Sequence, residues 1–465
     1  MRTRRGRTGR TRWTIEGCSS ALARTGSLRA LAAELADPRR GWAIAALGFL
    51  LAFSPSGPAL AQRPGSGISQ PDSAAAHAYL DLALDLIQRR SINGDSVDWQ
   101  SIRPAAHARV GADGSTAAAY PAIRWVLAQL RDHHSVLLEP EEAVALSRGL
   151  SRGFGFRAIY PEGTVVQVYA GGPADAAGVR VGDVMTAVDG ARPSADARGA
   201  LVELPSADTV RITLRRIGSS VRDLVLAAEP VDLNGLPTSR RIRGEIGYLE
   251  LPQHLGEGAV GDSASYIDAG QSAIRAADSP PACGWIVDLR RNGGGNVWPM
   301  LAVIGPVLGD GVAGAFVSPG ATRTWSYDRG RAMLDGVPRA TASDLYATQR
   351  QAAPVAVLTS RVTASSGEAI AISFRGRPNT RSFGEATQGV PTANANFPLS
   401  DGAVLVLATA VDADRTGRRY RGRIEPDVQV RLDWPSFGRQ DDPVIAAAAA
   451  WLRAQPECGG RDRPR

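Results

Sequence analysis

Apolar residues recur at helical spacing in two segments near the start of the folded part of the chain. Residues 74–90 (AAAHAYLDLALDLIQRR) carry apolar side chains at helical intervals and end on two arginines, which favours a helix. Residues 121–131 (PAIRWVLAQLR) repeat this pattern and stop at Asp132. The pattern therefore predicts a small helical domain over residues 63–150.

The pattern changes to short alternating runs in residues 151–232. Residues 165–169, 210–216 and 224–228 alternate between apolar and polar positions, and glycine, proline and aspartate turns separate them. These runs predict the strands of a small, partly open β-barrel.

Residues 233–455 read as an α/β unit. Residues 245–251 (EIGYLEL) alternate as a strand, whereas 284–289 (GWIVDL) and 354–358 (PVAVL) are nearly continuous apolar runs, typical of strands buried on both faces. Further elements are expected at 365–374 and 443–454 as helices and at 403–408 and 428–430 as strands. Together the three segments predict an α+β multidomain protein, with residues 456–465 as a tail.

A basic leader precedes these segments. Arg39 and Arg40 stand before the apolar run 42–53 (WAIAALGFLLAF), and Ala-Leu-Ala follows at 59–61. A basic flank, a short apolar segment and an A-x-A ending are typical of a secretory signal, so we expect cleavage after Ala61 and treat residues 1–62 as leader and signal peptide. The protein is then periplasmic or secreted. Membrane association is expected only if this segment stays uncleaved.

The net charge of +7 does not indicate nucleic acid as a partner. Residues 1–40 contain ten arginines against three acidic residues, and the remaining 425 residues hold 43 basic and 43 acidic side chains. The body of the protein is therefore neutral, and no nucleic-acid-binding surface is predicted.

The side chains available for proton transfer limit the mechanism. All 53 Lys+Arg positions are arginine, which excludes a Schiff-base lysine, a P-loop lysine and a Ser–Lys dyad. The bases suited to neutral pH are then a carboxylate shifted by burial or one of five histidines: His77, His107, His133, His134 and His254.

The sequence does not decide whether its cysteines form a disulfide. Signal cleavage would remove Cys18, and Cys283 and Cys458 could either form a disulfide in an oxidising compartment or stay as two buried thiols. None has histidine or cysteine neighbours at metal-ligand spacing, so no zinc, other metal or cofactor is expected.

Two short motifs combine residue types that suit acyl transfer. Residues 288–295 (DLRRNGGG) lead from a buried strand into three glycines, whose backbone N–H groups could stabilise an oxyanion. Residues 363–368 (TASSGE) place a serine at the amino end of a helix, where negative charge is favoured. Taken singly, the first could be an ordinary turn and the second an ordinary capping box.

Residues 171–190 (GGPADAAGVRVGDVMTAVDG) resemble a PDZ domain, which we place at 151–232. The resemblance implies that a carboxylate-binding loop stands at Gly153, Phe154, Gly155 and Phe156. Backbone N–H groups there would hold the end of a peptide, and the adjacent strand edge would pair with its backbone. A PDZ fold with a blocked groove remains the alternative.

In this order, the two motifs and the segment 384–390 (GEATQGV) resemble the tail-specific, or carboxyl-terminal-processing, serine peptidases. The resemblance extends over roughly residues 75–455. It implies a crotonase-like ββα peptidase core at 233–455, preceded by a PDZ domain and a helical segment that carries a D-x-H-S motif.

The resemblance assigns roles to individual residues. Ser365, three positions before Glu368, is the implied nucleophile. The N–H groups of Gly294 or Gly295 and of Ser366 are the implied oxyanion donors.

One position departs from the family pattern. Val390 stands where the Ser–Lys members carry their base, and valine cannot accept a proton. A second branch, which includes tricorn-like proteases and nisin-resistance proteins, uses a histidine from the D-x-H-S segment, and the matching residue is His134. The resemblance also implies Glu425 as an acidic member of the site. It further implies Ser135, which follows His134 in the motif, as a site residue.

Each of these assignments has a rival. His133 or His254 could be the base in place of His134, and Glu425 could be a turn residue before Pro426. We expect His134, because Val390 leaves the serine otherwise unactivated.

The sequence thus predicts an exported serine endopeptidase that uses a Ser–His dyad, with a peptide or an unfolded protein as substrate. The alternative, supported by Val390, is a catalytically silent PDZ scaffold of the cell envelope that binds peptides only. A carrier of apolar ligands built on the same fold has no sequence feature in its favour.

Overall fold

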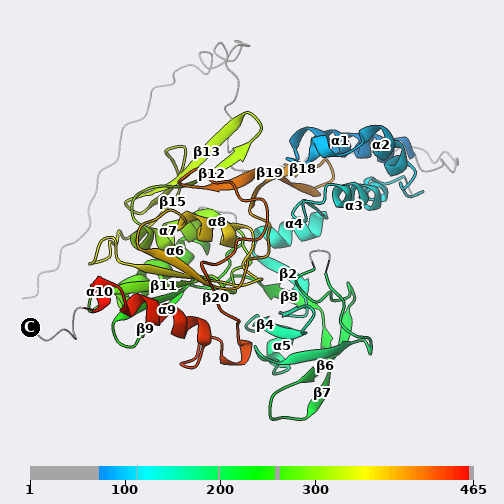
Figure 1. The fold of residues 1–465 in the computed structure, drawn as a ribbon. Coiled ribbons are helices and arrows are strands. Elements are labelled where there is room, and N and C mark those ends of the chain that lie inside the picture. Colours follow the sequence, from blue (N-terminus) through cyan, green and yellow to red (C-terminus); the bar gives the residue numbers. More distant parts are fainter. Residues whose placement is uncertain (1–72, 113, 197–198, 257–261, 460–465) are drawn as a thin grey trace, which may run out of the picture. The chain divides into compact units, whose positions relative to one another are not determined.

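A six-stranded, mostly parallel sheet forms the centre of the α/β unit expected at residues 233–455 (Figure 1). The computed structural model describes residues 73–112, 114–196, 199–256 and 262–459. The order across the sheet is β20-β17-β16-β11-β10-β9, and all neighbours are parallel except β9 and β10. The strands are β9 (Thr238–Ile242), β10 (Ile246–Glu250), β11 (Gly284–Asp288), β16 (Val355–Thr359), β17 (Thr380–Gly384) and β20 (Val428–Gln429).

Helices cover both faces of this sheet because successive side chains on its central strands point in opposite directions. Trp285 and Val287 of β11 pack with the helices α6, α7 and α8, while Ile286 packs with α9 on the other face. All three side chains are buried, as the continuous apolar run predicts. The helices are α6 (Asp262–Ala277), α7 (Val297–Leu308), α8 (Ser366–Ser373), α9 (Pro443–Arg453) and the short α10 (Pro456–Gly459).

A seven-stranded antiparallel sheet packs against α7 and α8 from the side opposite the central sheet. Its path is β1-β19-β12-β13-β14-β15, and β18 pairs with β19 beside this path. Trp325 of β13 lies in the shared core and donates from its indole nitrogen to Ser373 of α8 at 2.9 Å. The strands are β1 (Val136–Leu138), β12 (Gly311–Ser318), β13 (Ala321–Asp328), β14 (Arg331–Leu334), β15 (Val337–Thr341), β18 (Thr392–Pro398) and β19 (Val404–Asp414).

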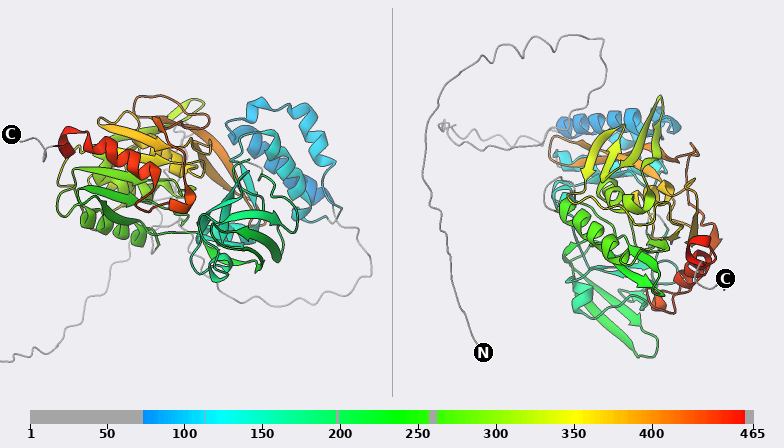
Figure 2. Two further views of the ribbon diagram at one scale, coloured as in Figure 1. Left: turned by 60° about the horizontal axis from the view of Figure 1, so that its bottom comes forward. Right: turned by 90° about the vertical axis from the view of Figure 1, so that its left-hand side faces the viewer.

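The two strands β18 and β19 form an arm on which the amino-terminal helices pack. Leu405 and Leu407 of β19 share a core with α1 and α3, and Tyr79 and Tyr120 donate hydrogen bonds of 2.8 and 2.7 Å to Asp401 between the two strands. Both views of Figure 2 show the blue helices beside these orange strands. The helical elements are α1 (Ser73–Arg90), η1 (Gly94–Ser96), α2 (Trp99–His107), η2 (Thr116–Ala119), α3 (Tyr120–Gln129) and α4 (Pro140–Ser147).

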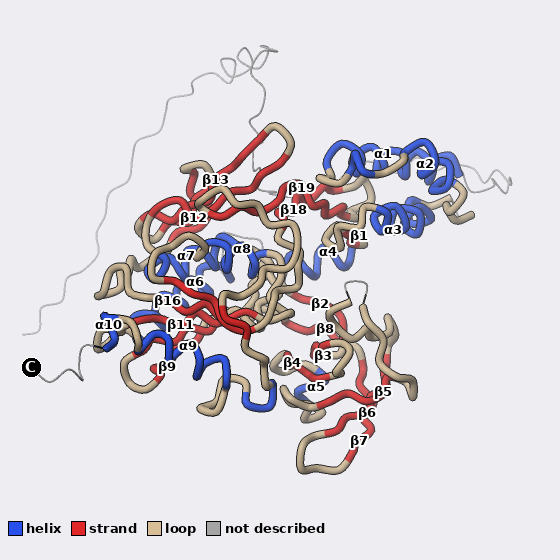
Figure 3. Tube along the Cα trace, in the orientation of Figure 1, coloured by secondary structure: helices blue, strands red, loops and turns tan. Residues whose placement is uncertain are grey.

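The predicted PDZ segment is a five-stranded antiparallel sheet in the order β3-β4-β5-β6-β7. Figure 3 shows it as strand and loop with one short helix, α5. A separate pair, β2 and β8, flanks it. Its elements are β2 (Leu150–Gly153), β3 (Phe156–Ile159), β4 (Thr164–Val168), α5 (Pro173–Ala176), β5 (Val184–Val188), β6 (Thr209–Arg215), β7 (Val221–Ala227) and β8 (Glu229–Asp232).

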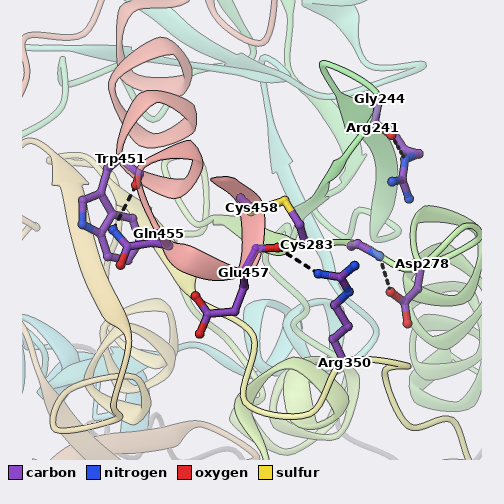
Figure 4. Close-up of a disulfide and its surroundings, with 10 residues drawn as sticks. Arg241, Gly244, Asp278, Cys283, Arg350, Trp451, Gln455, Glu457 and Cys458 are labelled. Atoms are coloured by element: carbon purple, nitrogen blue, oxygen red, sulfur yellow. Dashed lines mark hydrogen bonds between the residues drawn. A yellow bond between two sulfur atoms is a disulfide. The ribbon is translucent and has the colours of Figure 1, made fainter. Parts of the chain in front are cut away.

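A disulfide joins Cys283, just before β11, to Cys458 in α10 (Figure 4). Of the two states that the sequence left open, the structure therefore has the bonded one. Beside it, Arg350 donates to the carbonyl oxygen of Glu457 at 2.9 Å. At the other end of α9, Asp442 caps the helix by accepting from the N–H groups of its first turn. The disulfide thus attaches the carboxyl-terminal helix α10 to the residue that precedes β11.

The elements expected from apolar periodicity agree with the structure to within a few residues. Among the elements that were not predicted are β1, β9, β12 to β15, β17, β18, α2, α4, α6 and α7. Expected strand 403–408 is longer, because β19 continues to Asp414. The leader, the apolar run and the expected cleavage site lie outside the described residues. Within the described ranges, every helix is too short or too polar to cross a bilayer.

Cys458→Ser tests the contribution of the disulfide to stability. Removing a bond that closes a 175-residue separation should lower the free energy of unfolding by about 2–5 kcal/mol. Urea unfolding of the native protein with and without a thiol reductant measures this, and Cys458→Ser should not respond to the reductant. A native protein whose urea midpoint is the same with and without reductant would contradict the prediction.

Candidate active site

Ser365 lies at the amino end of α8, in the turn that follows β16. Its backbone has φ 52° and ψ −121°, a conformation that side chains other than glycine rarely adopt and that marks functional turns. The residue is half-buried, while Ala364 and Gly367 beside it are buried. The turn therefore holds Ser365 at the surface of an otherwise closed helix start.

The glycine loop after β11 lies directly against this turn. A Cβ atom on Gly294 would come within 2.7 Å of the Ser365 Cβ and 3.1 Å of the Ser366 nitrogen, and one on Gly295 within 2.0 Å of the carbonyl oxygen of His254. Both glycines have positive φ, 103° and 108°. Only glycine fits at these two positions, because a side chain on either would collide with its neighbours. The loop can therefore lie close to Ser365.

The structure separates the three expected oxyanion donors. The N–H of Gly294 donates to Asn292 Oδ1 at 2.9 Å. The amides of Gly295 and Ser366 form no hydrogen bond within the described ranges. The Ser366 hydroxyl donates to the carbonyl oxygen of Gly295 at 2.5 Å, which ties the loop to the helix start. The amides of Gly295 and Ser366 are therefore the two of the three without an acceptor among the described residues.

A buried ion pair fixes the strand end from which this loop departs. Arg290 donates to Asp288 at 2.6 Å and contacts Asp442 at 2.8 Å, and all three side chains are about 1% exposed. Burial disfavours the charge on Arg290, but the nearby Asp288 outweighs it and raises the pKa of the guanidinium. Tyr248 also donates to Asp288, at 2.7 Å. Every group of this cluster is paired, so the strand end is held in one arrangement.

The carboxyl group of Glu368 joins the nucleophile turn to the segment before β18. Oε2 accepts from the amides of Ser365 and Val390, both at 2.9 Å, and Oε1 accepts from the hydroxyl of Thr387 at 2.5 Å and the amide of Gly389 at 3.0 Å. Burial raises the pKa of Glu368 to about 7, against these hydrogen bonds, which favour the charged form. The sequence indicated Glu368 only as a family marker or a helix cap.

Asp412 of β19 is a second buried carboxyl group close to Glu368. It is 1% exposed, and its Oδ1 has no hydrogen-bond partner in the described part of the chain. Burial, and then the charge of Glu368, raise its pKa well above the ordinary value. Because donors surround Glu368 but not Asp412, we place the proton of the pair on Asp412. The sequence carried no signal for this residue.

His134 is buried and held by a loop that Asp132 organises. The Asp132 carboxylate accepts from the amides of His134 and Ser135 at 2.9 and 2.8 Å. The ring nitrogen Nδ1 of His134 lies 2.5 Å from the hydroxyl of Thr392, the first residue of β18. Asn394 donates to the carbonyl oxygen of His134 at 3.2 Å. The histidine is thus attached to the arm.

Hydrogen bonds link His134 to the nucleophile turn through that arm. The amide of Thr392 donates to the carbonyl oxygen of Val390 at 2.9 Å, and the amide of Val390 shares Glu368 Oε2 with the amide of Ser365. Strand β1, which follows the histidine loop, pairs with β19 in the same arm. His134 is therefore held beside the segment that contains Val390.

The other candidates lie elsewhere or are engaged. The Ser135 hydroxyl donates to Asp132 at 2.6 Å and accepts from the amide of Ala408 at 3.0 Å, so it attaches the loop to β19. His133 is exposed, with φ 54°. Glu425 is exposed and accepts from Gln429 at 3.2 Å. The hydroxyl at His134 Nδ1 belongs to Thr392, which the sequence did not indicate.

The rival base His254 lies on the other side of the glycine loop. It is 2% exposed, its ring lies 4.6 Å from that of Tyr266 between centroids, and its carbonyl oxygen accepts from Asn296 at 2.6 Å. Its backbone bridges to Gly295. These contacts make it a support for the loop.

A groove of about 600 Å³ opens beside the expected carboxylate-binding loop. Gly153, Phe154, Gly155 and Phe156 all line it, together with Tyr169. The two phenylalanine side chains are buried in the PDZ core, so the loop presents its backbone. The amides of Phe154 and Gly155 form no hydrogen bond to another described residue. Two adjacent N–H groups at one end of a groove suit a peptide carboxylate.

No metal site accompanies these groups in the part of the chain that the structure describes. Nowhere there do three or more His, Cys, Asp or Glu side chains gather as ligands would.

Comparison with known proteins gives two family matches. Residues 245–430 match peptidase family S41, and residues 164–216 match the PDZ domain. The S41 match includes Ser365 and the glycine loop, but it begins at residue 245 and so does not reach back to His134. The assignment of the base consequently depends on geometry.

Among curated relatives, the chain is 30% identical over 216 residues to the nisin-resistance protein of Lactococcus lactis subsp. lactis. That alignment covers 46% of this chain and 62% of the relative. It is 28% identical over 387 residues to the chloroplastic C-terminal processing peptidase of Tetradesmus obliquus, covering 77% of this chain and 75% of the relative.

Two solved structures share the fold. The photosystem II D1 C-terminal processing protease superposes with a TM-score of 0.51 at 23% identity, covering 77% of this chain and 93% of that chain. A lipoprotein from Streptococcus agalactiae gives 0.51 at 19% identity, covering 85% of this chain and 99% of that chain. At these identities the similarity concerns the fold alone.

Asp412→Asn tests whether the buried carboxyl pair limits stability at alkaline pH. The folded protein binds the Asp412 proton more tightly than the unfolded chain, because its pKa is raised on folding. The free energy of unfolding is therefore largest below the unfolded pKa of about 4 and falls as pH rises toward the raised value. Urea unfolding from about pH 5 to about pH 9 should show a smaller loss in the variant.

Asp414→Asn is the matched control on the same strand. Hydrogen bonds from Thr416 and Tyr420 outweigh burial and lower the pKa of Asp414, so this change should not flatten the alkaline dependence. The same pH dependence in the native protein and in Asp412→Asn would show that the raised pKa is absent.

Proposed function

From the match of residues 245–430 to peptidase family S41, we propose that the chain is an exported serine endopeptidase that cleaves unstructured or C-terminally exposed chains with Ser365 and His134. The observation that carries the proposal is the shared carboxylate of Glu368. It joins the strained turn of Ser365 to the segment on which His134 is held. For the core we propose the crotonase-like ββα type, in keeping with the helix-covered sheet that positions this turn.

The reaction follows the acyl-enzyme route. Ser365 Oγ attacks the carbonyl carbon of the scissile peptide while His134 Nε2 accepts the hydroxyl proton. The amides of Gly295 and Ser366 stabilise the resulting oxyanion. The tetrahedral intermediate collapses, the C–N bond breaks, and the imidazolium gives its proton to the leaving amine. Water then attacks the ester, again deprotonated by His134, and releases the carboxylic acid and free Ser365.

Thr392 orients the base in this scheme. For Nε2 to accept a proton, the neutral imidazole must carry its hydrogen on Nδ1, and the Thr392 hydroxyl at 2.5 Å is placed to accept that hydrogen bond. A hydroxyl contributes no charge, so it fixes the tautomer and the ring plane without the electrostatic stabilisation that a carboxylate would add.

The groove at residues 153–156 supplies substrate capture. A peptide end held by the amides of Phe154 and Gly155 would keep the rest of an unfolded chain at high effective concentration near Ser365. Binding at one point and cleavage at another favours chains that are extended between the two, which is the substrate class proposed.

Export is proposed from two observations. The leader has the pattern of a signal peptide, and Cys283 and Cys458 form a disulfide. Disulfides persist in oxidising compartments and are rare in the cytosol, so both point to the periplasm or the exterior.

A silent peptide-binding scaffold is the second candidate. It is favoured by Val390, which is 4% exposed and occupies the position of the lysine base in Ser–Lys relatives. The proposal of an active enzyme requires that His134 replaces that lysine, and the two candidates differ in whether peptide bonds are broken.

Ser365→Ala and His134→Ala should each lower kcat for an unfolded protein substrate by at least about 1,000-fold, because the two groups act as a unit. Cleavage is followed by mass spectrometry of the products. His133→Ala is the matched control, since this neighbouring ring is exposed, and it should keep native activity. Undiminished cleavage by Ser365→Ala or His134→Ala would refute the dyad.

Thr392→Val removes the hydroxyl at constant shape and should lower kcat by roughly 10–100-fold, the equivalent of losing one hydrogen bond to a charged ring. KM should change little. Thr392→Ser keeps the hydroxyl and should restore most of the rate. If valine and serine variants are equally active, Thr392 has no orienting role.

A further inference from the structure

The loop between β19 and β20 concentrates positive charge on a protein body that is otherwise neutral. Residues 415–423 contain five arginines and no acidic residue. Four of these side chains are exposed, and none of the four forms an ion pair with a described residue: Arg418, Arg419, Arg421 and Arg423. The nearest acidic residues along the chain are Asp414, which is buried, and the exposed Glu425, two residues after Arg423.

The loop holds these arginines in a defined arrangement. The buried carboxylate of Asp414 accepts from the amide and the hydroxyl of Thr416 at 2.8 and 2.6 Å. It also accepts from the amide of Arg418 at 3.2 Å and from the hydroxyl of Tyr420 at 2.7 Å. Tyr420 is 7% exposed, so its ring anchors the loop in the core. A loop fixed in this way loses little conformational entropy when it binds a ligand.

The carboxyl end of this loop lies against the active-site segment. A Cβ on Gly389 would come within 3.0 Å of the Cγ and the backbone nitrogen of Arg423, and the amide of Gly389 donates to Glu368 at 3.0 Å. The next residue, Ile424, exchanges hydrogen bonds with Thr387 at 2.9 and 3.2 Å. The basic loop is therefore joined to the segment 387–390, one hydrogen bond from the carboxylate that holds Ser365.

Four neighbouring guanidinium groups repel one another, and their field attracts an anion to this edge of the active site. Guanidinium groups recognise carboxylates through paired N–H donors. An extended peptide that passes Ser365 presents its side chains within reach of this edge, whereas a lipid surface would need the edge to be flat and the catalytic segment to face the bilayer. The location next to the nucleophile favours the peptide.

We propose that these four arginines, the arginine loop, bind acidic side chains of the substrate next to the scissile bond, and so make the enzyme selective for acidic peptide segments. This inference rests on the proposed function, because it names the substrate class of the same site. It concerns substrate residues that flank the cleaved bond, and these differ from the chain end that the groove at residues 153–156 would hold.

Two internally quenched peptides test the proposal. They share length and carboxyl terminus, and differ only in three glutamates beside the cleavable bond that are glutamines in the second peptide. The native enzyme should cleave the acidic peptide with a kcat/KM about ten-fold higher, and the ratio should fall toward one at high salt. The test variant should show a ratio near one: R418Q/R419Q/R421Q/R423Q.

A charge-matched variant controls for net charge. It replaces four exposed arginines far along the chain from the arginine loop and should keep the native ratio: R89Q/R90Q/R329Q/R339Q. Thermal unfolding of both variants checks that they fold. A native ratio near one, or a ratio that survives in the loop variant, would overturn the proposal.

Binding to the Ser365→Ala protein separates this inference from the proposed function. Fluorescence anisotropy should show tighter binding of the acidic peptide, and the loop substitutions should abolish the difference. Arginine-dependent binding without cleavage by the native protein would refute the enzyme and keep the loop assignment. If the loop instead binds phosphatidylglycerol vesicles and does not distinguish the peptides, its partner is a lipid surface and the proposal is wrong.

Discussion

One buried carboxylate connects the parts of this active site that the chain supplies from distant positions. Glu368 accepts hydrogen bonds from Ser365 and from three donors in the segment 387–390. A buried carboxylate is tolerated only if its lone pairs are satisfied, so the helix start and the segment are fixed relative to each other by the cost of leaving Glu368 unpaired. The strained backbone conformation of Ser365 persists because the hydrogen bonds to Glu368 hold the turn in place.

The arm β18–β19 extends this constraint to the histidine. It begins two residues after Val390, carries Thr392 at the ring of His134, pairs with β1 and packs under the amino-terminal helices. In the proposed mechanism, His134 takes the role of the missing lysine base, and strand pairing holds it beside the same segment although it comes from a different part of the sequence. The absence of lysine is consistent with an active enzyme on this account.

The sequence predicted what depends on local pattern. The central strands β11 and β16, the helices α1, α3 and α9, and the turn of Ser365 followed from apolar runs, helical spacing and motif residues. It did not predict β12 to β15, whose exposed faces mix polar residues and glycine, nor the far end of β19, because Asp412 and Asp414 look like surface residues and are buried. Thr392 and Asp412 act through tertiary contacts between distant segments, for which one sequence contains no periodic signal.

The most direct measurement of the central claim is the rate at which a fluorophosphonate modifies Ser365, followed by peptide mass spectrometry over pH. An imidazole that removes the serine proton should make this rate rise with pH and then level off once the ring is neutral, and His134→Ala should abolish the pH-dependent rise. Absence of an adduct on Ser365, or a pH profile that is unchanged in His134→Ala, would contradict the account.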